Sequence, residues 1–178
     1  MVSEKIQDML NDQIAKEFYA SNYYLSMASW CDTKGYEGGT NFFLAQSAEE
    51  RDHGMRIFQY INSLDGHAIA PMIEKPPVDF ESYPKIFQIA LDQERENTAA
   101  IHEIVDVTLQ EKDYSTYNFM HWYLDEQVEE ENMFRGIIDK LNIIGDDKSG
   151  IYMLDKDLGQ RRSTGGGADG DAGGGEEA

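Results

Sequence analysis

Residues 40–64 read TNFFLAQSAEERDHGMRIFQYINSL. Apolar and aromatic side chains recur every three or four positions along this stretch, which predicts an amphipathic helix. Glu50 and His53 stand in the middle of the apolar stripe, three positions apart and therefore on the same helical face. A helix face that should be buried thus carries two ionisable groups at its centre.

The same helical period extends over nearly the whole chain, so strands are not expected. Ser3 and Ser82 are suitable N-caps, and Pro84 is tolerated in the first turn of a helix. Four long helices and one short helix are predicted, over 3–33, 40–64, 82–111, 114–144 and 147–158.

The connection between the second and third helices predicts the topology. Segment 65–81 holds three of the four prolines and is expected to be extended. It can span ~56 Å, which exceeds the ~40 Å length of one predicted helix. Short turns make the first and second helices, and the third and fourth, antiparallel hairpins. The fold class is therefore all-α: a four-helix bundle with one long crossover between helices two and three, plus a short fifth helix.

Length and charge restrict the class of protein. The chain has 178 residues, which suits one compact domain, and its formal net charge is −19. The basic residues are scattered among acids, whereas a nucleic-acid-binding protein needs clustered lysines and arginines. We therefore expect no nucleic-acid partner, and an acidic body that attracts cations.

Nothing in the sequence predicts export or membrane insertion. The single cysteine, Cys31, favours a reducing compartment. The N-terminus lacks the apolar run of a signal peptide, and no stretch approaches the ~20 apolar residues of a membrane span. We expect a cytoplasmic protein with no membrane partner, in which residues 1–160 form one domain and the glycine- and acid-rich residues 161–178 form a disordered tail.

Every long helix places a carboxylate on the face that should be apolar. These are Glu17, Glu50, Glu94 and Glu130, and no lysine or arginine lies on the four stripes. A lone buried carboxylate costs several kcal/mol unless it is protonated, paired or bound to metal. Two divalent cations would cancel four such charges, and oxygen ligands with one imidazole nitrogen suit iron or manganese. Any one of these glutamates alone is more often a boundary residue that reaches water, but four together favour a metal site.

Four segments carry a resemblance to a known family. They read EFYASNYYL at 17–25, AEERDHG at 48–54, FMHWYLDEQVEEE at 119–131 and GIYMLDKDL at 150–158. In these segments, and in the spacing between them, the chain resembles the ferritins, particularly the bacterial haem-free type, over residues 3 to about 160. A Glu-x-x-His motif with glutamates from the other helices is the arrangement described for ferritin-like di-iron bundles.

The resemblance implies a ferroxidase centre that holds two irons per subunit. Glu17, Glu50 and His53 match the first iron position. Glu50, Glu94 and Glu130 match the second, so that Glu50 bridges the two irons.

Further positions are implied around this centre. Gln127 occupies a neighbouring position that many ferritins also hold as glutamine. Tyr24 matches a tyrosine that hydrogen-bonds a ligand or donates an electron, although a plain core aromatic is an equal alternative. Bacterial members have a third iron position nearby, and it corresponds to Glu49, Glu126, Glu129 and Glu130.

The chain also departs from related patterns. The fourth helix reads Gln127-Val-Glu-Glu130, without the second Glu-x-x-His of bacterioferritins, and no methionine matches their haem-ligand position. We therefore expect no haem. Tyr117 and Met120 stand where animal ferritins place the acids of a threefold channel.

The resemblance implies an iron-storage protein with ferroxidase activity. Such a protein oxidises Fe(II) to Fe(III) with O2 or H2O2 and mineralises it inside a hollow homo-oligomeric shell of twenty-four subunits. Two alternatives stay open: a small-oligomer di-metal oxidase or peroxide-scavenging protein without storage, and a metal-free helical bundle used for assembly or partner binding.

Overall fold

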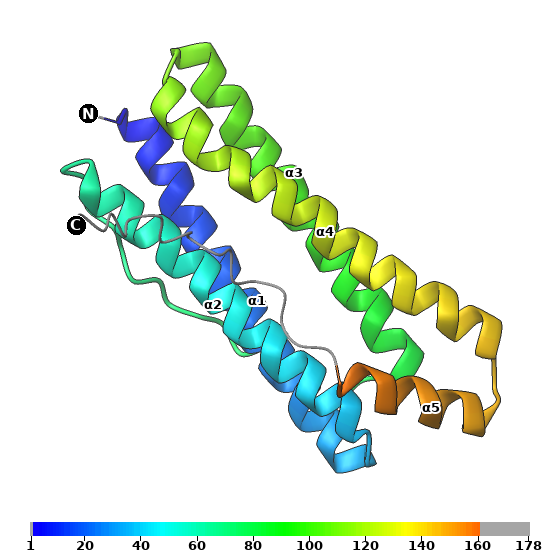
Figure 1. The fold of residues 1–178 in the computed structure, drawn as a ribbon. Coiled ribbons are helices and arrows are strands. Elements are labelled where there is room, and N and C mark those ends of the chain that lie inside the picture. The colour runs from blue at the N-terminus through cyan, green and yellow to red at the C-terminus, as the bar shows by residue number, and fades with distance from the viewer. Residues whose placement is uncertain (1, 161–178) are drawn as a thin grey trace, which may run out of the picture.

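The computed structural model describes residues 2–160 of the chain. Over this range the chain forms helices and no strands (Figure 1). The helices are α1 (Glu4–Lys34), α2 (Glu37–Ser63), α3 (Tyr83–Glu111), α4 (Tyr114–Ile144) and α5 (Lys148–Leu158).

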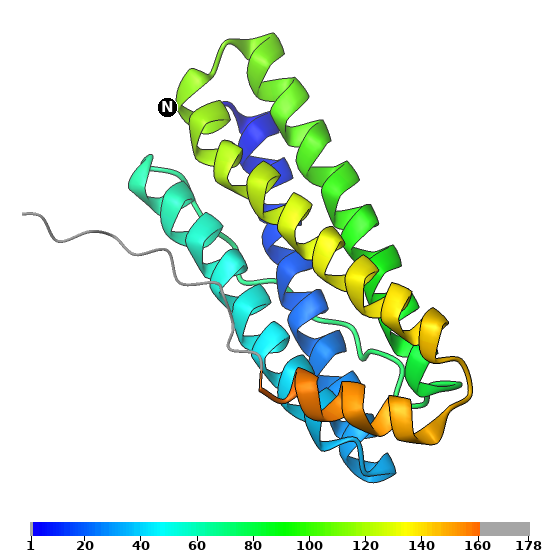
Figure 2. The same cartoon turned by 45° about the vertical axis from the view of Figure 1, so that its right-hand side comes forward.

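The helices form two antiparallel hairpins that lie side by side (Figure 1). One hairpin consists of α1 and α2, and the other of α3 and α4. Segment 64–82 runs back along the length of the bundle, so that α2 and α3 point in the same direction, and α5 crosses the end where α2 begins (Figure 2). The predicted all-α bundle with one long crossover and a short fifth helix is confirmed.

The helix boundaries follow from local capping. The Ser3 and Ser82 side chains accept hydrogen bonds from the backbone N–H groups three residues later, as predicted for N-caps. The Asp113 carboxylate caps α4 in the same way. Gly35 ends α1 with a φ of 81°, a left-handed conformation that glycine adopts without a steric penalty.

The predicted start of α2 at Thr40 is wrong, because α2 begins at Glu37. Gly38 and Gly39 suggest a helix break, but here they are the first-turn residues of a helix capped by another segment. Their N–H groups donate hydrogen bonds of 3.0 and 2.8 Å to the two carboxylate oxygens of Asp155 in α5. Asp155 therefore neutralises the partial positive charge at the N-terminus of α2 and attaches α5 to the bundle.

Two apolar clusters lie along the bundle, one on each side of a polar middle. The cluster toward α5 contains Tyr24, Phe43, Phe87, Phe134 and Leu158 among others. The cluster at the other end contains aliphatic side chains of all four long helices, including Leu10, Ile57, Ile101 and Met120. The four carboxylates named above lie between these clusters in the chain order of each helix.

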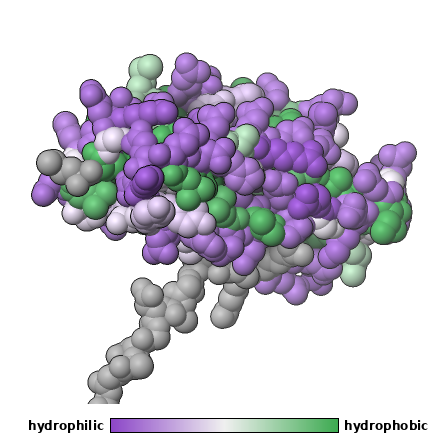
Figure 3. Space-filling model, turned by 90° about the horizontal axis from the view of Figure 1, so that it is seen from above, coloured by the Kyte–Doolittle hydropathy of each residue, from purple (hydrophilic) through white to green (hydrophobic). Residues whose placement is uncertain are grey.

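The visible surface is mostly hydrophilic, with several separate hydrophobic patches (Figure 3). Across residues 2–160, no helix combines the length and the apolar character needed to cross a membrane. The prediction of a disordered tail over 161–178 falls outside the residues that the structure describes.

The close approach of α5 to α2 gives a test of the capping contact. A Cβ atom at position 38 would lie 1.6 Å from the Asp155 carbonyl oxygen, so Gly38→Ala must displace α5. We expect a loss of about 2 kcal/mol or more, which lowers the thermal unfolding midpoint by about 4–8 °C.

The matched control is Gly136→Ala, because an added Cβ there meets nothing within 4 Å on an exposed face of α4. This variant should be neutral or stabilised by about 0.5–1 kcal/mol. Equal midpoints for the two variants, measured by circular dichroism, would contradict the close packing of α5 against the start of α2.

Candidate metal centre

The four predicted carboxylates all lie in the interior of the bundle, one from each long helix. Glu17 and Glu50 are 0% and 1% exposed, and Glu94 and Glu130 are 1% and 4% exposed. Within the part of the chain that the structure describes, none of them forms an ion pair with a lysine or arginine. They are therefore not boundary residues that reach water.

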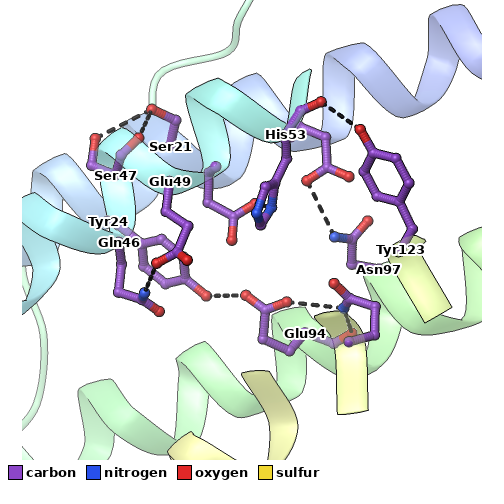
Figure 4. A network of polar contacts seen from close by, with 12 residues as sticks. Ser21, Tyr24, Gln46, Ser47, Glu49, His53, Glu94, Asn97 and Tyr123 are labelled. Atoms are coloured by element: carbon purple, nitrogen blue, oxygen red, sulfur yellow. Dashed lines mark hydrogen bonds and ion pairs between the residues drawn. The ribbon is translucent and has the colours of Figure 1, made fainter. Parts of the chain in front are cut away.

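Glu17, Glu50 and His53 form one compact group. One potential ligand atom from each lies within 4.8 Å of the other two. The His53 Nδ1 atom is 3.6 Å from the Glu50 Oε2 atom. The backbone carbonyl of His53 accepts a 2.8 Å hydrogen bond from the Tyr123 hydroxyl, which ties α4 to this point of α2 (Figure 4).

Glu94 is held from two sides on the opposite wall of the centre. Its carboxylate accepts a hydrogen bond from the Tyr24 hydroxyl and another, of 3.1 Å, from the Gln127 amide. The same Gln127 amide lies 3.2 Å from the Glu94 carbonyl oxygen. Tyr24 and Gln127, both predicted from the sequence, thus lie beside the centre and orient Glu94. Figure 4 shows the Tyr24 hydroxyl directed at the Glu94 carboxylate.

Two amide side chains hold Glu17 and were not predicted as site residues. Gln13 Nε2 donates a 2.8 Å hydrogen bond to one Glu17 oxygen, and Asn97 Nδ2 donates a 3.3 Å bond to the other. Gln13 also donates to the Asn97 side-chain oxygen, which links α1 to α3. The helical spacing could have predicted that these amides lie near the carboxylates. Gln13 lies one helical turn before Glu17, and Asn97 lies three positions after Glu94.

Several buried oxygen atoms in this region have no hydrogen-bond partner among the described residues. They include Glu50 Oε2 and Glu130 Oε2. A buried acceptor without a donor costs about 1–3 kcal/mol, and more when it is charged. Carboxylate oxygens aimed into a polar interior are suitable ligands for a divalent cation, so the residues fit a metal centre.

Burial and mutual repulsion shift the protonation of these acids. Burial, followed by the charges of Glu94 and Glu17, raises the pKa of Glu50 well above its ordinary value. Burial raises the pKa of Glu94 to about 7, although hydrogen bonds from Tyr24 and Gln127 oppose the shift. Burial and the Glu94 charge raise the pKa of Glu130 to about 9. Without a cation, the centre therefore holds protons at neutral pH.

A second acidic group lies next to the first and shares His53 with it. Ligand atoms of Glu49, His53 and Glu126 lie within 4.8 Å of one another. Glu49 is buried and accepts a 2.8 Å hydrogen bond from the Gln46 amide, whereas Glu126 is half-buried. Burial raises the pKa of Glu126, with His53 opposing and Glu49 adding to the shift.

The structure places the other residues predicted for a third metal position less closely. Glu130 faces Glu94, Glu49 and Glu126, whose charges all raise its pKa. Glu129 is exposed on α4, and its charge contributes to the raised pKa of Glu126. Neither Glu129 nor Glu130 belongs to the compact group around Glu49.

Comparisons with known proteins show the family of this chain. The pattern of the ferritin-like domain family matches residues 7–144 of the chain. The chain belongs to the ferritin family. It is 43% identical over 159 residues to a probable bacterial non-heme ferritin-like protein of Haemophilus influenzae, covering 89% of this chain and 96% of that protein.

Two further proteins that are similar to this chain are also described as ferritins. Bacterial non-heme ferritin of Staphylococcus aureus is 43% identical over 161 residues, which cover 90% of this chain and 97% of that protein. Among solved structures, a ferritin of the hyperthermophilic archaeon Archaeoglobus fulgidus, described as an open-pore ferritin, superposes with a TM-score of 0.89 at 40% identity. The superposition covers 91% of this chain and 100% of that chain.

The raised pKa values predict how the stability of the metal-free protein depends on pH. A carboxyl whose pKa is raised on folding binds its proton more tightly in the folded state, so stability falls as pH rises above the unfolded value. For Glu94 and Glu130 this window runs from about 4.5 to about 7 and about 9. We expect the thermal midpoint of the metal-free protein to fall across this range.

A divalent cation should remove this loss, because it replaces the protons as the compensating charge. Co(II), which is not oxidised under these conditions, should raise the midpoint more at pH 8 than at pH 5, and its binding should release protons. Calorimetry in buffers of different ionisation enthalpy measures both effects. A midpoint gain that is equal at the two pH values would contradict the buried-acid account.

The contact between Asn97 and Glu17 gives a second test of the centre. Asn97→Ala removes one of the two amides that orient Glu17, and loss of such an outer partner typically costs 10–100-fold in metal affinity. Co(II) titration under anaerobic conditions measures this change. The control is Gln88→Ala on the same helix, whose amide bonds only Asp92 at the surface and whose loss should leave Co(II) affinity unchanged.

Proposed function

We propose that this protein stores iron and has ferroxidase activity. The observation that carries the proposal is the set of four buried carboxylates from four different helices, joined by His53 and without any lysine or arginine partner among the described residues. Membership of the ferritin family and the names of the bacterial non-heme ferritin relatives support the same function.

Two Fe(II) ions are the substrate of this centre. The first is bound by Glu17, Glu50 and His53, and the second by Glu50, Glu94 and Glu130, with Glu50 as the bridge. Support comes from the compact first group and from the Glu50 and Glu130 Oε2 atoms, which accept no hydrogen bond among the described residues. The two ions give one electron each to O2 or H2O2, and the carboxylates bind both oxidation states of iron.

The protein's own groups hold the substrate and accept charge. Binding of Fe(II) releases the protons that the raised pKa values retain on Glu50, Glu94 and Glu130. Gln127 and Tyr24 keep the Glu94 carboxylate turned toward the centre, and Gln13 and Asn97 do the same for Glu17. No haem takes part.

A third iron binds beside the centre, on the shared face of α2 and α4. Glu49 and Glu126 supply the close ligands beside His53, and Glu129 and Glu130 complete the acidic surroundings. Exposure of Glu129 and partial exposure of Glu126 connect this position to solvent.

Met120 does not line a channel, because it is fully buried in the apolar cluster.

Oxidised iron is then mineralised in the hollow interior of a homo-oligomeric shell of twenty-four cytoplasmic subunits. Exposed apolar side chains on the isolated chain, such as Met72 and Ile143, provide contact surface for such an assembly. The proposal includes no nucleic-acid partner, because the basic residues are scattered among acids in the sequence.

The proposed function is tested by anaerobic Fe(II) titration followed by rapid mixing with O2. We expect two to three tight Fe(II) sites per chain, fast oxidation, and continued soluble iron uptake in a particle sized by light scattering. Glu50→Gln removes the bridging charge and should slow oxidation by at least a factor of about 100, equivalent to about 2.7 kcal/mol. Glu103→Gln, on the exposed face of α3, should have no effect.

The other outcomes separate the alternatives. Fast oxidation without iron uptake in a small oligomer would identify a di-metal oxidase or peroxide-scavenging protein. Absence of tight Fe(II) binding would exclude both enzymes and leave a structural bundle.

A further inference from the structure

A continuous line of aromatic rings leads away from the metal centre toward α5. It begins at Tyr24, whose hydroxyl donates a hydrogen bond to Glu94. The Tyr24 ring lies 5.8 Å from the ring of Phe43, measured between centroids, and Phe43 lies 5.2 Å from Phe87. Phe87 in turn lies 5.3 Å from Tyr83, so two phenylalanine rings join two tyrosines.

The far end of this line is a tyrosine with a built proton acceptor. The Tyr83 hydroxyl, buried with its ring, donates a 2.7 Å hydrogen bond to Asp155 Oδ1. Its ring stacks on Tyr36 at 3.9 Å with an angle of 12° between the planes. The Asp155 carboxylate also accepts bonds from the Gly38 and Gly39 N–H groups, so the Tyr83 hydroxyl is its third donor. The phenol and the carboxylate are therefore held in direct hydrogen-bond contact at a buried position.

That hydroxyl has a specific chemical capacity. A phenol loses an electron readily only when its proton can leave at the same time. A phenylalanine ring is not oxidised under these conditions, so an electron passes between the two tyrosines by tunnelling through the phenylalanine rings. Burial and the hydrogen bond to Asp155 raise the pKa of Tyr83, so the proton stays on the phenol at rest. The neighbouring carboxylate is in position to take it when the electron leaves.

We propose that Tyr83 and Asp155 form a redox relay that receives an oxidising equivalent from Tyr24. The inference rests on the proposed ferroxidase function, which supplies the oxidant, O2. Reduction of O2 to two waters takes four electrons and four protons. The iron pair gives two electrons, a third Fe(II) gives one, and Tyr24 gives one while its own proton passes to Glu94; solvent supplies the four protons that form water. An electron then moves from Tyr83 to the Tyr24 radical. The Tyr24 oxygen recovers its proton from Glu94, and the Tyr83 proton moves to Asp155.

The surroundings of the pair favour retention of the radical there. Trp30 is the next oxidisable ring, 6.4 Å from Tyr36. The Lys34 ammonium lies 5.7 Å from the Trp30 ring, and a cation so close opposes the loss of an electron from that ring. The relay thus moves the oxidising equivalent away from the metal ligands to the stacked tyrosines. The radical stays there until a one-electron reductant, such as further Fe(II), reduces it.

Freeze-quench electron paramagnetic resonance tests this proposal on the assembled full-length protein. The protein is loaded anaerobically with Fe(II) to the measured stoichiometry and mixed with O2, and Fe(III) formation is followed by absorbance in parallel. We expect two successive tyrosyl signals in the unsubstituted protein. Tyr83→Phe should reduce the later signal at least several-fold, and Tyr24→Phe should remove both.

Tyr60→Phe is the matched control. Tyr60 is a half-buried tyrosine whose hydroxyl lies 3.1 Å from Thr116, in the apolar cluster at the other end of the bundle, and its loss should leave both signals intact. Normal Co(II) affinity verifies that Tyr83→Phe and Tyr60→Phe fold with the centre intact. Tyr24→Phe removes a hydrogen bond to the ligand Glu94, so it is loaded with Fe(II) to its own measured stoichiometry before mixing with O2. Two unchanged signals in Tyr83→Phe, or Fe(III) formation without a second signal in the unsubstituted protein, would overturn the relay but leave the ferroxidase proposal standing. Absence of Fe(III) formation would instead overturn the ferroxidase proposal and the relay together.

Discussion

Four buried carboxylates repel one another at the middle of this helical bundle. Glu17, Glu50, Glu94 and Glu130 share one dehydrated region between four helices, where each charge raises the cost of the next. The metal-free chain reduces this cost by keeping protons on some of these acids. Bound cations would reduce this electrostatic cost more completely. The affinity of the centre for cations and the raised pKa values of its carboxyls therefore have the same physical origin, the repulsion among buried charges.

Apolar packing in the rest of the fold offsets the free-energy cost of burying these carboxylates. Apolar clusters on both sides bury large aromatic and aliphatic side chains, and these clusters fix the spacing of the helices across the polar middle. At one end, the Asp155 carboxylate of α5 accepts hydrogen bonds from the N-terminus of α2 and from the Tyr83 hydroxyl at the start of α3. A rigid scaffold on both sides allows like charges to be held together at fixed positions.

The sequence was informative where a residue interrupted an expected pattern. Glu50 and His53 stood out because a helical apolar stripe has no other reason to contain them, and the long proline-containing connection predicted the crossover. The start of α2 could not be predicted, because its cap comes from Asp155, more than a hundred positions later in the chain. Asn97 was missed for a related reason, since an amide on a helix is unremarkable until its partner on α1 is known.

The hydrogen-bond donors around the buried carboxylates are neutral amides, and this choice is consistent with a centre that attracts cations. The carboxylates of Glu17, Glu94 and Glu49 are oriented by the amides of Gln13, Asn97, Gln127 and Gln46. A lysine or arginine would hold a carboxylate more strongly, but it would also cancel the charge that attracts a cation and would repel the cation itself. Neutral amides fix direction without neutralising charge. Uncharged donors therefore leave the centre able to attract a cation, which ion pairs with lysine or arginine would not.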